Sequence, residues 1–261
     1  VVALAEKTYG SKEHFIEAMN KKAESLGLKN THFVNVHGLD EEGHYSSAYD
    51  MSVMARELLK HEKILDFTRV YEEYLTKPDG SQIWLVNTNK LVRFYDGVDG
   101  LKTGFTQNAG YCLTATGKKN NLRLISVVMG EESIEKRSSD TVKLLNYGFN
   151  TFKVNLIKHK SEILGKVNVQ KGKKENVDVV LVNDLRELLN ASDKPSNYKF
   201  KILVDKITAP VKKGDVIGKV KVLNDNGILI SEVDITVNEN VLKANLWDLF
   251  KRNLKYNLVW N

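Results

Sequence analysis

The stretch Val98-Asp99-Gly100-Leu101-Lys102-Thr103-Gly104-Phe105-Thr106 leads into two β-rich arms, residues 111–116 and 122–129, on either side of a turn at 117–121. The arms favour extended backbone and the turn consists of Gly, Lys and Asn, a pattern that predicts an antiparallel hairpin. A further strand is predicted at 82–87. Together these segments predict the sheet around which this part of the chain is built.

Apolar periodicity predicts helices around this sheet, at residues 11–26, 47–60 and about 133–147. Ser47 and Asp50 have the spacing of a capping box at the start of the second helix. In the third helix Val142, Leu145 and Tyr147 are expected to face the sheet. Helices packed around an antiparallel sheet define a layered α/β (α+β) domain, which we assign to residues 1–152.

Residues 153–240 predict a small all-β domain, because short alternating strands are separated by turn signals. These strands are predicted at 177–182, 198–204, 216–222 and 228–237. Between the last two, Asn224-Asp225-Asn226-Gly227 predicts a tight hairpin turn whose central residues have positive φ.

Residues 241–261 return to a helical period and predict an amphipathic helix. Its apolar side is formed by Leu242, Leu246, Leu249, Phe250, Leu254 and Leu258, flanked by Trp247 and Trp260, with Lys251, Arg252 and Lys255 opposite. Such a helix suits a membrane interface, where cations lie near lipid phosphates. The alternative is a terminal helix packed on the β domain, because Lys243, Asn253 and Asn257 interrupt the apolar side.

The composition is that of an ordinary globular protein of 261 residues, 42% hydrophobic and 28% charged. No apolar run approaches the roughly 18–20 residues of a membrane span, so an integral transmembrane protein is not expected. The single cysteine, Cys112, cannot form an internal disulfide and is expected to be a buried, inert thiol. The opening Val-Val-Ala-Leu-Ala-Glu carries no secretion signal.

The net charge of +6 belongs to the second half of the chain. Residues 153–261 contain 20 Lys and Arg against 13 Asp and Glu, whereas residues 1–152 contain 19 against 20. A basic surface suits an anionic partner, such as an anionic lipid or an acidic polymer. Nucleic acid is not expected as a partner, because no known nucleic-acid-binding pattern accompanies the lysines.

The histidines do not predict a metal site. His32 and His37 are five residues apart and His44 lies seven further on, so no two have the i, i+4 spacing of a helical metal-binding pair. Structural histidines are the better interpretation, and no metal or other cofactor is predicted.

Lys102, Thr103 and Gly104 could line a ligand-binding strand. On an exposed strand Lys102 and Gly104 share one face and Thr103 lies on the other, while glycine lacks the Cβ that would block a ligand backbone. Threonine offers a hydroxyl and lysine a positive charge to a carboxylate. The tripeptide alone is weak evidence, because composition gives it a roughly one-in-ten chance of occurring somewhere in the chain, so its surroundings decide its meaning.

Three blocks of sequence give the tripeptide its context. They are residues 98–111, Thr31-His32-Phe33-Val34-Asn35-Val36-His37-Gly38-Leu39 and Tyr45-Ser46-Ser47-Ala48-Tyr49-Asp50-Met51. In their order along the chain, 31–39, 45–51 and 98–111, they resemble the D-alanyl-D-alanine carboxypeptidases, the low-molecular-mass penicillin-binding proteins. The resemblance implies a penicillin-binding-protein/serine β-lactamase-like domain, N-terminally incomplete, followed by a small all-β domain and an amphipathic helix.

The family has three motifs, Ser-x-x-Lys, Ser-x-Asn and Lys-Thr-Gly, of which only the third matches here. The resemblance implies that the chain starts just after Ser-x-Asn, so nucleophile, base and signal peptide are expected upstream. Ser-x-x-Lys strings also begin at Ser133 and Ser196, but composition makes one or two such strings expected by chance.

Residue by residue, the resemblance makes Lys102 catalytic, because it polarises the cleft, and also a ligand of the substrate carboxylate. Thr103 contributes its hydroxyl, Gly104 admits the substrate backbone and Thr106 reaches the ligand. Arg137 matches the family arginine that faces the terminal carboxylate, which suits a guanidinium. Phe105 stands where many members have His, which implies an altered substrate preference.

The implied activity is serine-type D-Ala-D-Ala carboxypeptidase, acting through an acyl-serine intermediate. The implied partners are a peptidoglycan stem peptide ending in D-Ala-D-Ala, β-lactam antibiotics, and a membrane surface bound by the C-terminal helix. The implied location is extracytoplasmic, at the outer face of the bacterial cytoplasmic membrane. The chain alone is expected to be inactive, and the alternative is a truncated, catalytically inactive relative that binds the wall or the membrane.

Overall fold

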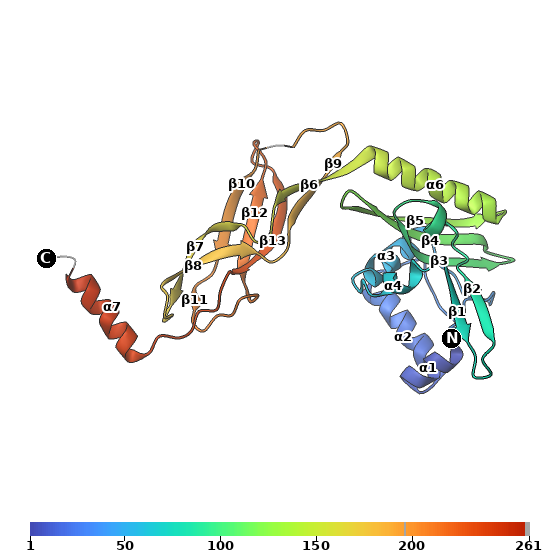
Figure 1. Cartoon of the computed structure of the whole chain (residues 1–261), viewed down its shortest axis with the longest axis horizontal. Coiled ribbons are helices and arrows are strands. Elements are labelled where there is room, and N and C mark those ends of the chain that lie inside the picture. Colours follow the sequence, from blue (N-terminus) through green and yellow to red (C-terminus); the bar gives the residue numbers. More distant parts are fainter. Residues whose placement is uncertain (196, 259–261) are drawn as a thin grey trace. The chain divides into compact units, whose positions relative to one another are not determined.

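A computed structural model describes residues 1–195 and 197–258. Two compact units follow one another along the chain, Val1–Phe152 and Lys153–Asn261 (Figure 1). Unit 1 combines helices with sheet, and unit 2 is rich in β-structure. The predicted α/β fold class is therefore confirmed.

Unit 1 places its helices on both faces of a three-stranded sheet (Figure 1). The helices are α1 (Val2–Tyr9), α2 (Lys12–Ser25), α3 (Ala48–Leu58), α4 (Ile64–Thr68), α5 (Leu91–Phe94) and α6 (Ile134–Thr151). Ser47 caps α3 as predicted, by accepting from Asp50 N. Asp50 does not complete the box, because its buried carboxylate accepts from Asn30 N and the Thr31 hydroxyl, both at 2.8 Å. It thus ties the preceding loop to α3.

The sheet of unit 1 has the order β3-β4-β5, with β3 at Val98–Thr106, β4 at Gly110–Lys119 and β5 at Leu122–Glu131. Asn120 and Asn121 have φ of 47° and 65°, so a two-residue turn joins β4 to β5 and the arms run longer than predicted. Leu113 and Leu145 belong to the core between the sheet and α6. Tyr147 is 65% exposed, against prediction, because two residues turn a helix by about 200° from Leu145.

A second, two-stranded hairpin pairs β1 (Glu72–Thr76) with β2 (Gln82–Val86). The sequence predicted only β2. The sequence did not predict β1, because both strands are exposed throughout and no buried face imposes an alternating apolar pattern. The hairpin leads directly into the loop at residues 87–90, which lies beside β3.

Unit 2 is built on a six-stranded sheet of order β10-β12-β13-β8-β7-β11, with β6 and β9 paired separately. Its strands are β6 (Phe152–Lys158), β7 (Ile163–Gln170), β8 (Asn176–Leu181), β9 (Leu185–Asn190), β10 (Lys199–Val204), β11 (Ile207–Thr208), β12 (Val216–Leu223) and β13 (Leu229–Val237). Alternate residues such as Val179, Val220 and Ile235 are fully buried. These buried side chains form part of the core of the unit.

The turn at residues 224–227 differs from the expected form. Only Gly227 has a positive φ, and the Asn224 side chain accepts from Asn226 N and Ile228 N. The last helix, α7, spans Leu246–Leu258. It begins later than the predicted residue 241, because Val241 is still paired with Val211 in a β-bridge. Trp260 lies outside the described residues, as do the side chains of Asn253, Lys255, Asn257 and Leu258. Within the part described, no helix is long and apolar enough to cross a membrane.

Candidate active site

The edge of the sheet formed by β3 is where the Lys-Thr-Gly tripeptide lies. β3 pairs with β4 on one side, in the register Lys102↔Thr114, Thr103↔Leu113 and Gly104↔Cys112. No described strand pairs with its other side. An unpaired strand edge can accept an extended peptide by main-chain hydrogen bonds. The second half of β3 is therefore suited to hold a peptide ligand.

Thr103 is linked to Arg137 through a residue that the sequence did not single out. The Thr103 and Thr88 hydroxyls are 2.7 Å apart, and Arg137 donates through Nη2 to Thr88 O at 3.4 Å. Two predicted site residues from β3 and α6 thus meet at the loop after the β1–β2 hairpin. Only the spatial approach of this loop to β3 identifies Thr88, since its local sequence has no motif.

Arg137 is a buried cation that forms no ion pair with a described residue. Its side chain is on α6 and the residue is 4% exposed, yet Nε has no hydrogen-bond partner among the described residues. Of the acids on the same helix, Glu135 acts on Arg137 only through space, and Asp140 is paired with Lys136 and Lys143. Burial lowers the pKa of the Arg137 guanidinium, which the Cys112 and Tyr111 side chains oppose. A carboxylate ligand would satisfy the orphaned donor and the charge.

Lys102 and Gly104 lie on the exposed part of β3. Lys102 Nζ donates to the carbonyl oxygen of Thr103 and forms no ion pair with any described residue. A Cβ built on Gly104 would meet only Cys112 Cβ, at 3.9 Å. Packing therefore does not require glycine here, and the missing Cβ leaves room beside the strand.

Thr106 closes the turn after β3 and also lines a hollow. Its hydroxyl oxygen accepts from Ala109 N at 3.0 Å, which leaves its proton free for another acceptor. The hollow measures about 610 Å³ and also includes Gly104, Asp40 and His44. Burial lowers the pKa of His44, whose Nδ1 accepts from Val34 N. The structure thus groups Gly104 and Thr106 at this hollow, and Thr103 and Arg137 at Thr88.

Phe105 places an apolar ring beside the candidate site. Its ring is 54% exposed and packs on Tyr111, with the ring centres 4.3 Å apart. The pair forms an apolar surface beside the Lys-Thr-Gly segment. Phe105 stands where the resemblance gives many family members a histidine.

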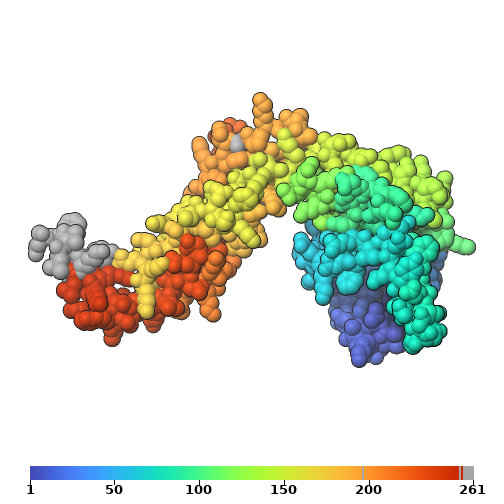
Figure 2. Space-filling view, in the orientation of Figure 1, coloured from blue at the N-terminus to red at the C-terminus, as the bar shows by residue number. Residues whose placement is uncertain are grey.

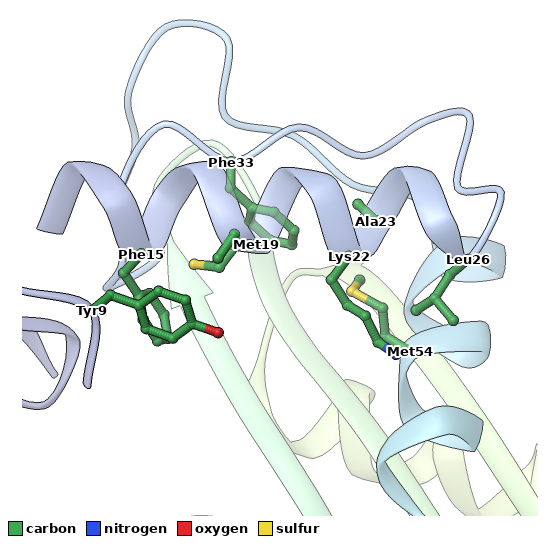
Figure 3. A pocket seen from close by; sticks show the side chains of 9 residues that line it. Tyr9, Phe15, Met19, Lys22, Ala23, Leu26, Phe33 and Met54 are labelled. Atoms are coloured by element: carbon green, nitrogen blue, oxygen red, sulfur yellow. The ribbon is translucent and has the colours of Figure 1, made fainter.

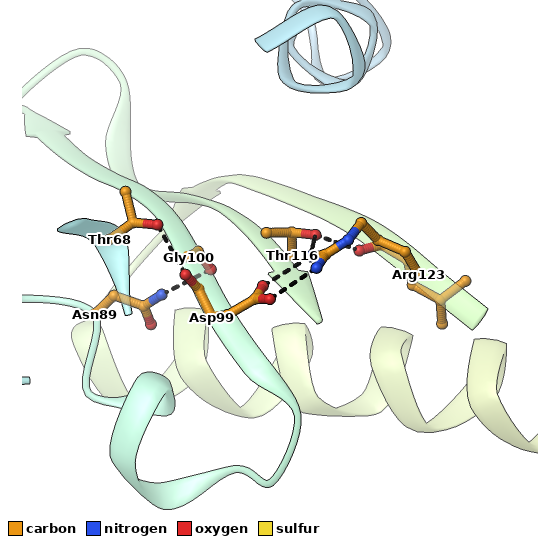
Figure 4. Close-up of polar contacts among 7 residues, drawn as sticks. Thr68, Asn89, Asp99, Gly100, Thr116 and Arg123 are labelled. Carbon is orange, nitrogen blue, oxygen red and sulfur yellow. Dashed lines mark hydrogen bonds and ion pairs between the residues drawn. The ribbon is translucent and has the colours of Figure 1, made fainter. Parts of the chain in front are cut away.

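The first half of β3 is fastened by polar contacts (Figure 4). Asp99 receives two hydrogen bonds of 2.8 Å from the Arg123 guanidinium, and Arg123 also reaches the Thr116 hydroxyl at 3.0 Å. The backbone carbonyls of Asp99 and Gly100 accept from Thr68 and Asn89. These contacts fix the strand that carries the site residues.

A separate hollow of about 290 Å³ lies between α1, α2 and the loop that carries Phe33 (Figure 3). Its lining is apolar, including Phe15, Met19 and Leu26, and the Lys22 ammonium binds Glu57 at 3.0 Å. It therefore lacks groups for chemistry. Among the described residues no cluster of His, Cys, Asp and Glu is placed to hold a metal ion.

Ser133 has a structural role in place of a nucleophilic one. Its hydroxyl caps α6 by accepting from Lys136 N at 3.1 Å, and the Lys136 ammonium lies 3.8 Å from Asp140. Ser196 lies outside the described residues. The Ser133 string therefore lacks the serine–base contact that nucleophilic catalysis needs.

Comparison with known proteins shows which class this architecture belongs to. In fold, the chain resembles penicillin binding protein 5 from Haemophilus influenzae, with a TM-score of 0.66 and 33% identity over 93% of this chain and 70% of that one. It also resembles PBP3 from Streptococcus pneumoniae, described as a peptidoglycan synthesis regulatory factor, with a TM-score of 0.70 and 25% identity over 92% and 73% of the two chains. The fold is thus that of the penicillin-binding proteins.

The sequence comparison narrows this class to a family. Residues 1–133 match the family model of D-alanyl-D-alanine carboxypeptidase, and residues 152–243 match the C-terminal domain of penicillin-binding protein 5. The D-alanyl-D-alanine carboxypeptidase DacF of Bacillus subtilis is 42% identical over 97% of this chain. The chain belongs to the D-alanyl-D-alanine carboxypeptidase family, which confirms the resemblance. It spans 65% of the length of DacF, and 56% and 63% of two further curated relatives.

Proposed function

We propose that the protein is a serine-type D-Ala-D-Ala carboxypeptidase that removes the terminal D-alanine from peptidoglycan stem peptides and binds β-lactams. The observation that carries this proposal is the buried Arg137, whose Nε has no partner among the described residues, beside the open edge of β3. A peptide lying along β3 would bring its terminal carboxylate to the guanidinium. Family membership supports the same reaction.

Each site residue has a role in this reaction that its surroundings support. Arg137 binds the terminal carboxylate, and the Thr103 hydroxyl, held at 2.7 Å from Thr88, donates to it. Gly104 lets the substrate backbone approach, and Thr106 offers its free proton. Lys102 brings positive charge to the cleft, which stabilises the oxyanion that develops during acyl transfer.

The acylating serine is proposed to lie outside residues 1–261. The Ser133 hydroxyl already caps α6, and the sequence contains no Ser-x-Asn string. In the proposed reaction the serine oxygen attacks the carbonyl carbon of the penultimate D-alanine, and the peptide bond to the terminal D-alanine breaks. The released amine takes up a proton, and water then hydrolyses the acyl-serine.

We place this reaction outside the cytoplasmic membrane, with α7 resting on the outer surface of that membrane. The exposed fractions of Leu246, Trp247 and Phe250 are 87%, 61% and 52%, and Lys251 lies over the Trp247 ring. An exposed apolar group with adjacent cations is typical of an interfacial helix. The runner-up, a terminal helix packed on the β domain, would bury these side chains.

Labelling with a fluorescent penicillin tests the proposal. The full-length gene product, this 261-residue chain, and a full-length R137Q variant are incubated with the probe and analysed by denaturing gel and mass spectrometry. We expect label on the full-length protein, none on the chain, and strongly reduced label on the variant. Label on the chain at Ser133 or Ser196 would place the nucleophile within it. No label on the full-length protein would favour the inactive wall- or membrane-binding relative.

A further inference from the structure

The end of unit 2 from which α7 departs gathers lysines from three separate segments of the chain. Backbone hydrogen bonds hold these segments side by side, from Lys173 N to Leu242 O at 2.7 Å and from Val241 N to Val211 O at 2.8 Å. The lysines on them are all exposed: Lys171, Lys173, Lys174, Lys212, Lys213 and Lys243. We call this group the basic rim.

The basic rim is only weakly neutralised by acidic side chains. Lys174 pairs with Glu239 at 2.6 Å, whereas the other five lysines form no ion pair with a described residue. Two nearby carboxylates keep their charge but accept from backbone N–H groups, Asp215 from Lys212 N at 2.8 Å and Asp248 from Asn245 N at 3.0 Å. With Glu239 they make three carboxylates against the six rim lysines. The rim therefore presents an excess of positive charge to solvent.

Exposed apolar side chains adjoin the rim. Leu242 lies between rim residues and is 60% exposed, and Trp247 and Phe250 stack with their ring centres 5.5 Å apart. Arg252 ties α7 to the rim, because its Nε lies 2.8 Å from Glu175 and its Nη2 donates to Gly172 O. The start of α7, drawn in red, lies on the outside of unit 2 (Figures 1 and 2).

We propose that the basic rim is a binding surface for the headgroups of anionic lipids. A bilayer offers both features at once, a negatively charged surface for the lysines and an apolar layer for Leu242, Trp247 and Phe250. An acidic polymer in solution would match the charge but leave the apolar side chains exposed. The inference rests on the proposed attachment of α7 and deepens it, since it names the lipid class and assigns the charge contact to the β-domain.

Vesicle flotation tests the proposal with the full 261-residue chain. The vesicles contain phosphatidylcholine alone or with added phosphatidylglycerol, at low and high salt. In the rim variant, Lys171, Lys173, Lys212, Lys213 and Lys243 are changed to Gln. The matched control loses the same charge from exposed lysines elsewhere in unit 2, Lys160, Lys166, Lys194, Lys199 and Lys201. Circular dichroism checks that both variants are folded.

We expect the chain to prefer anionic vesicles and the rim variant to lose about tenfold or more of its binding to them. High salt should remove the same preference, because the contacts are solvent-exposed. The control should keep the preference, and both variants should bind neutral vesicles as the unchanged chain does.

Four results would overturn the proposed lipid-binding role of the rim. Equal losses of vesicle binding in the rim variant and the control would show that binding depends on net charge and not on the rim lysines. Equal binding of the unchanged chain to neutral and anionic vesicles would remove the lipid preference while the attachment of α7 stands. Rim-dependent binding to soluble poly(glycerol phosphate) but not to vesicles would assign the lysines to a polymer. Failure to float with any vesicle would instead remove the attachment itself, and the rim with it.

Discussion

The two halves of β3, residues 98–101 and residues 102–106, are both extended but differ in burial and in their contacts. Residues 98–101 contain the buried Val98 and Gly100 and are held by Arg123, Thr68 and Asn89. Residues 102–106 are largely exposed, and their outer edge meets little besides the Thr88 hydroxyl. The difference shows that one strand can join a structurally fixed segment to a proposed binding segment, because fixing one half also fixes the position of the other.

The largest effect on activity is expected at Arg137 of α6, next to the exposed half of β3, residues 102–106. R137Q should lower kcat/KM for a D-Ala-D-Ala peptide by about 100-fold or more in the full-length enzyme, because a charge-assisted contact to the carboxylate is lost. Thermal stability should stay equal or rise, since an unpaired buried charge is removed. R186Q, at an exposed arginine of unit 2, is the control. Unchanged kcat/KM in R137Q would contradict the proposed role.

A smaller effect is expected at the fastened half. D99N should destabilise unit 1 by about 2 kcal/mol, because it weakens the two-pronged contact with the part-buried Arg123. Urea unfolding followed by circular dichroism measures this change. R123K keeps the charge but loses the second prong, and should fall between D99N and the unchanged protein. Equal stability of all three proteins would show that the contact does not hold the strand.

Two glycines on β3 provide the sharpest test of the comparison. G100A should destabilise unit 1 by about 1–2 kcal/mol, because its Cβ would come within 2.6 Å of the Thr68 hydroxyl oxygen. G104A should leave the melting temperature unchanged, because its Cβ meets only Cys112 Cβ at 3.9 Å. Its acylation by penicillin should fall by about tenfold, since the Cβ obstructs the ligand backbone. The reverse outcome, a loss of stability in G104A alone, would break the division of the strand.

The smallest effect is a pH dependence at the hollow beside the open half. The pKa of His44 is lowered by burial, so the unfolded chain takes up this proton more readily than the folded one. The free energy of unfolding should therefore decrease as pH falls below 6.5, the ordinary value. H44N keeps an acceptor for Val34 N and should show a shallower decrease in urea titrations at several pH values. Identical slopes for both proteins would exclude His44 as a source.

Much of the fold was readable from local patterns. The cap at Ser47 and the hairpin of β4 and β5 follow from neighbouring residues, whose preferences act over a few positions. The β1 strand was missed because both faces of its hairpin are exposed. The positive φ values that were expected at residues 224–227 occur at Asn120 and Asn121 instead, and within residues 224–227 only Gly227 has one.

The sequence by itself determined the family, the Lys-Thr-Gly strand and the identity of its candidate ligand groups, because these depend on residue type and order along the chain. Only the tertiary structure brought Thr88 between Thr103 and Arg137, paired Asp99 with Arg123, and drew the lysines of the basic rim together. Each of these groupings joins segments that are distant in sequence. Their approach is decided by packing and strand register, which no local pattern encodes.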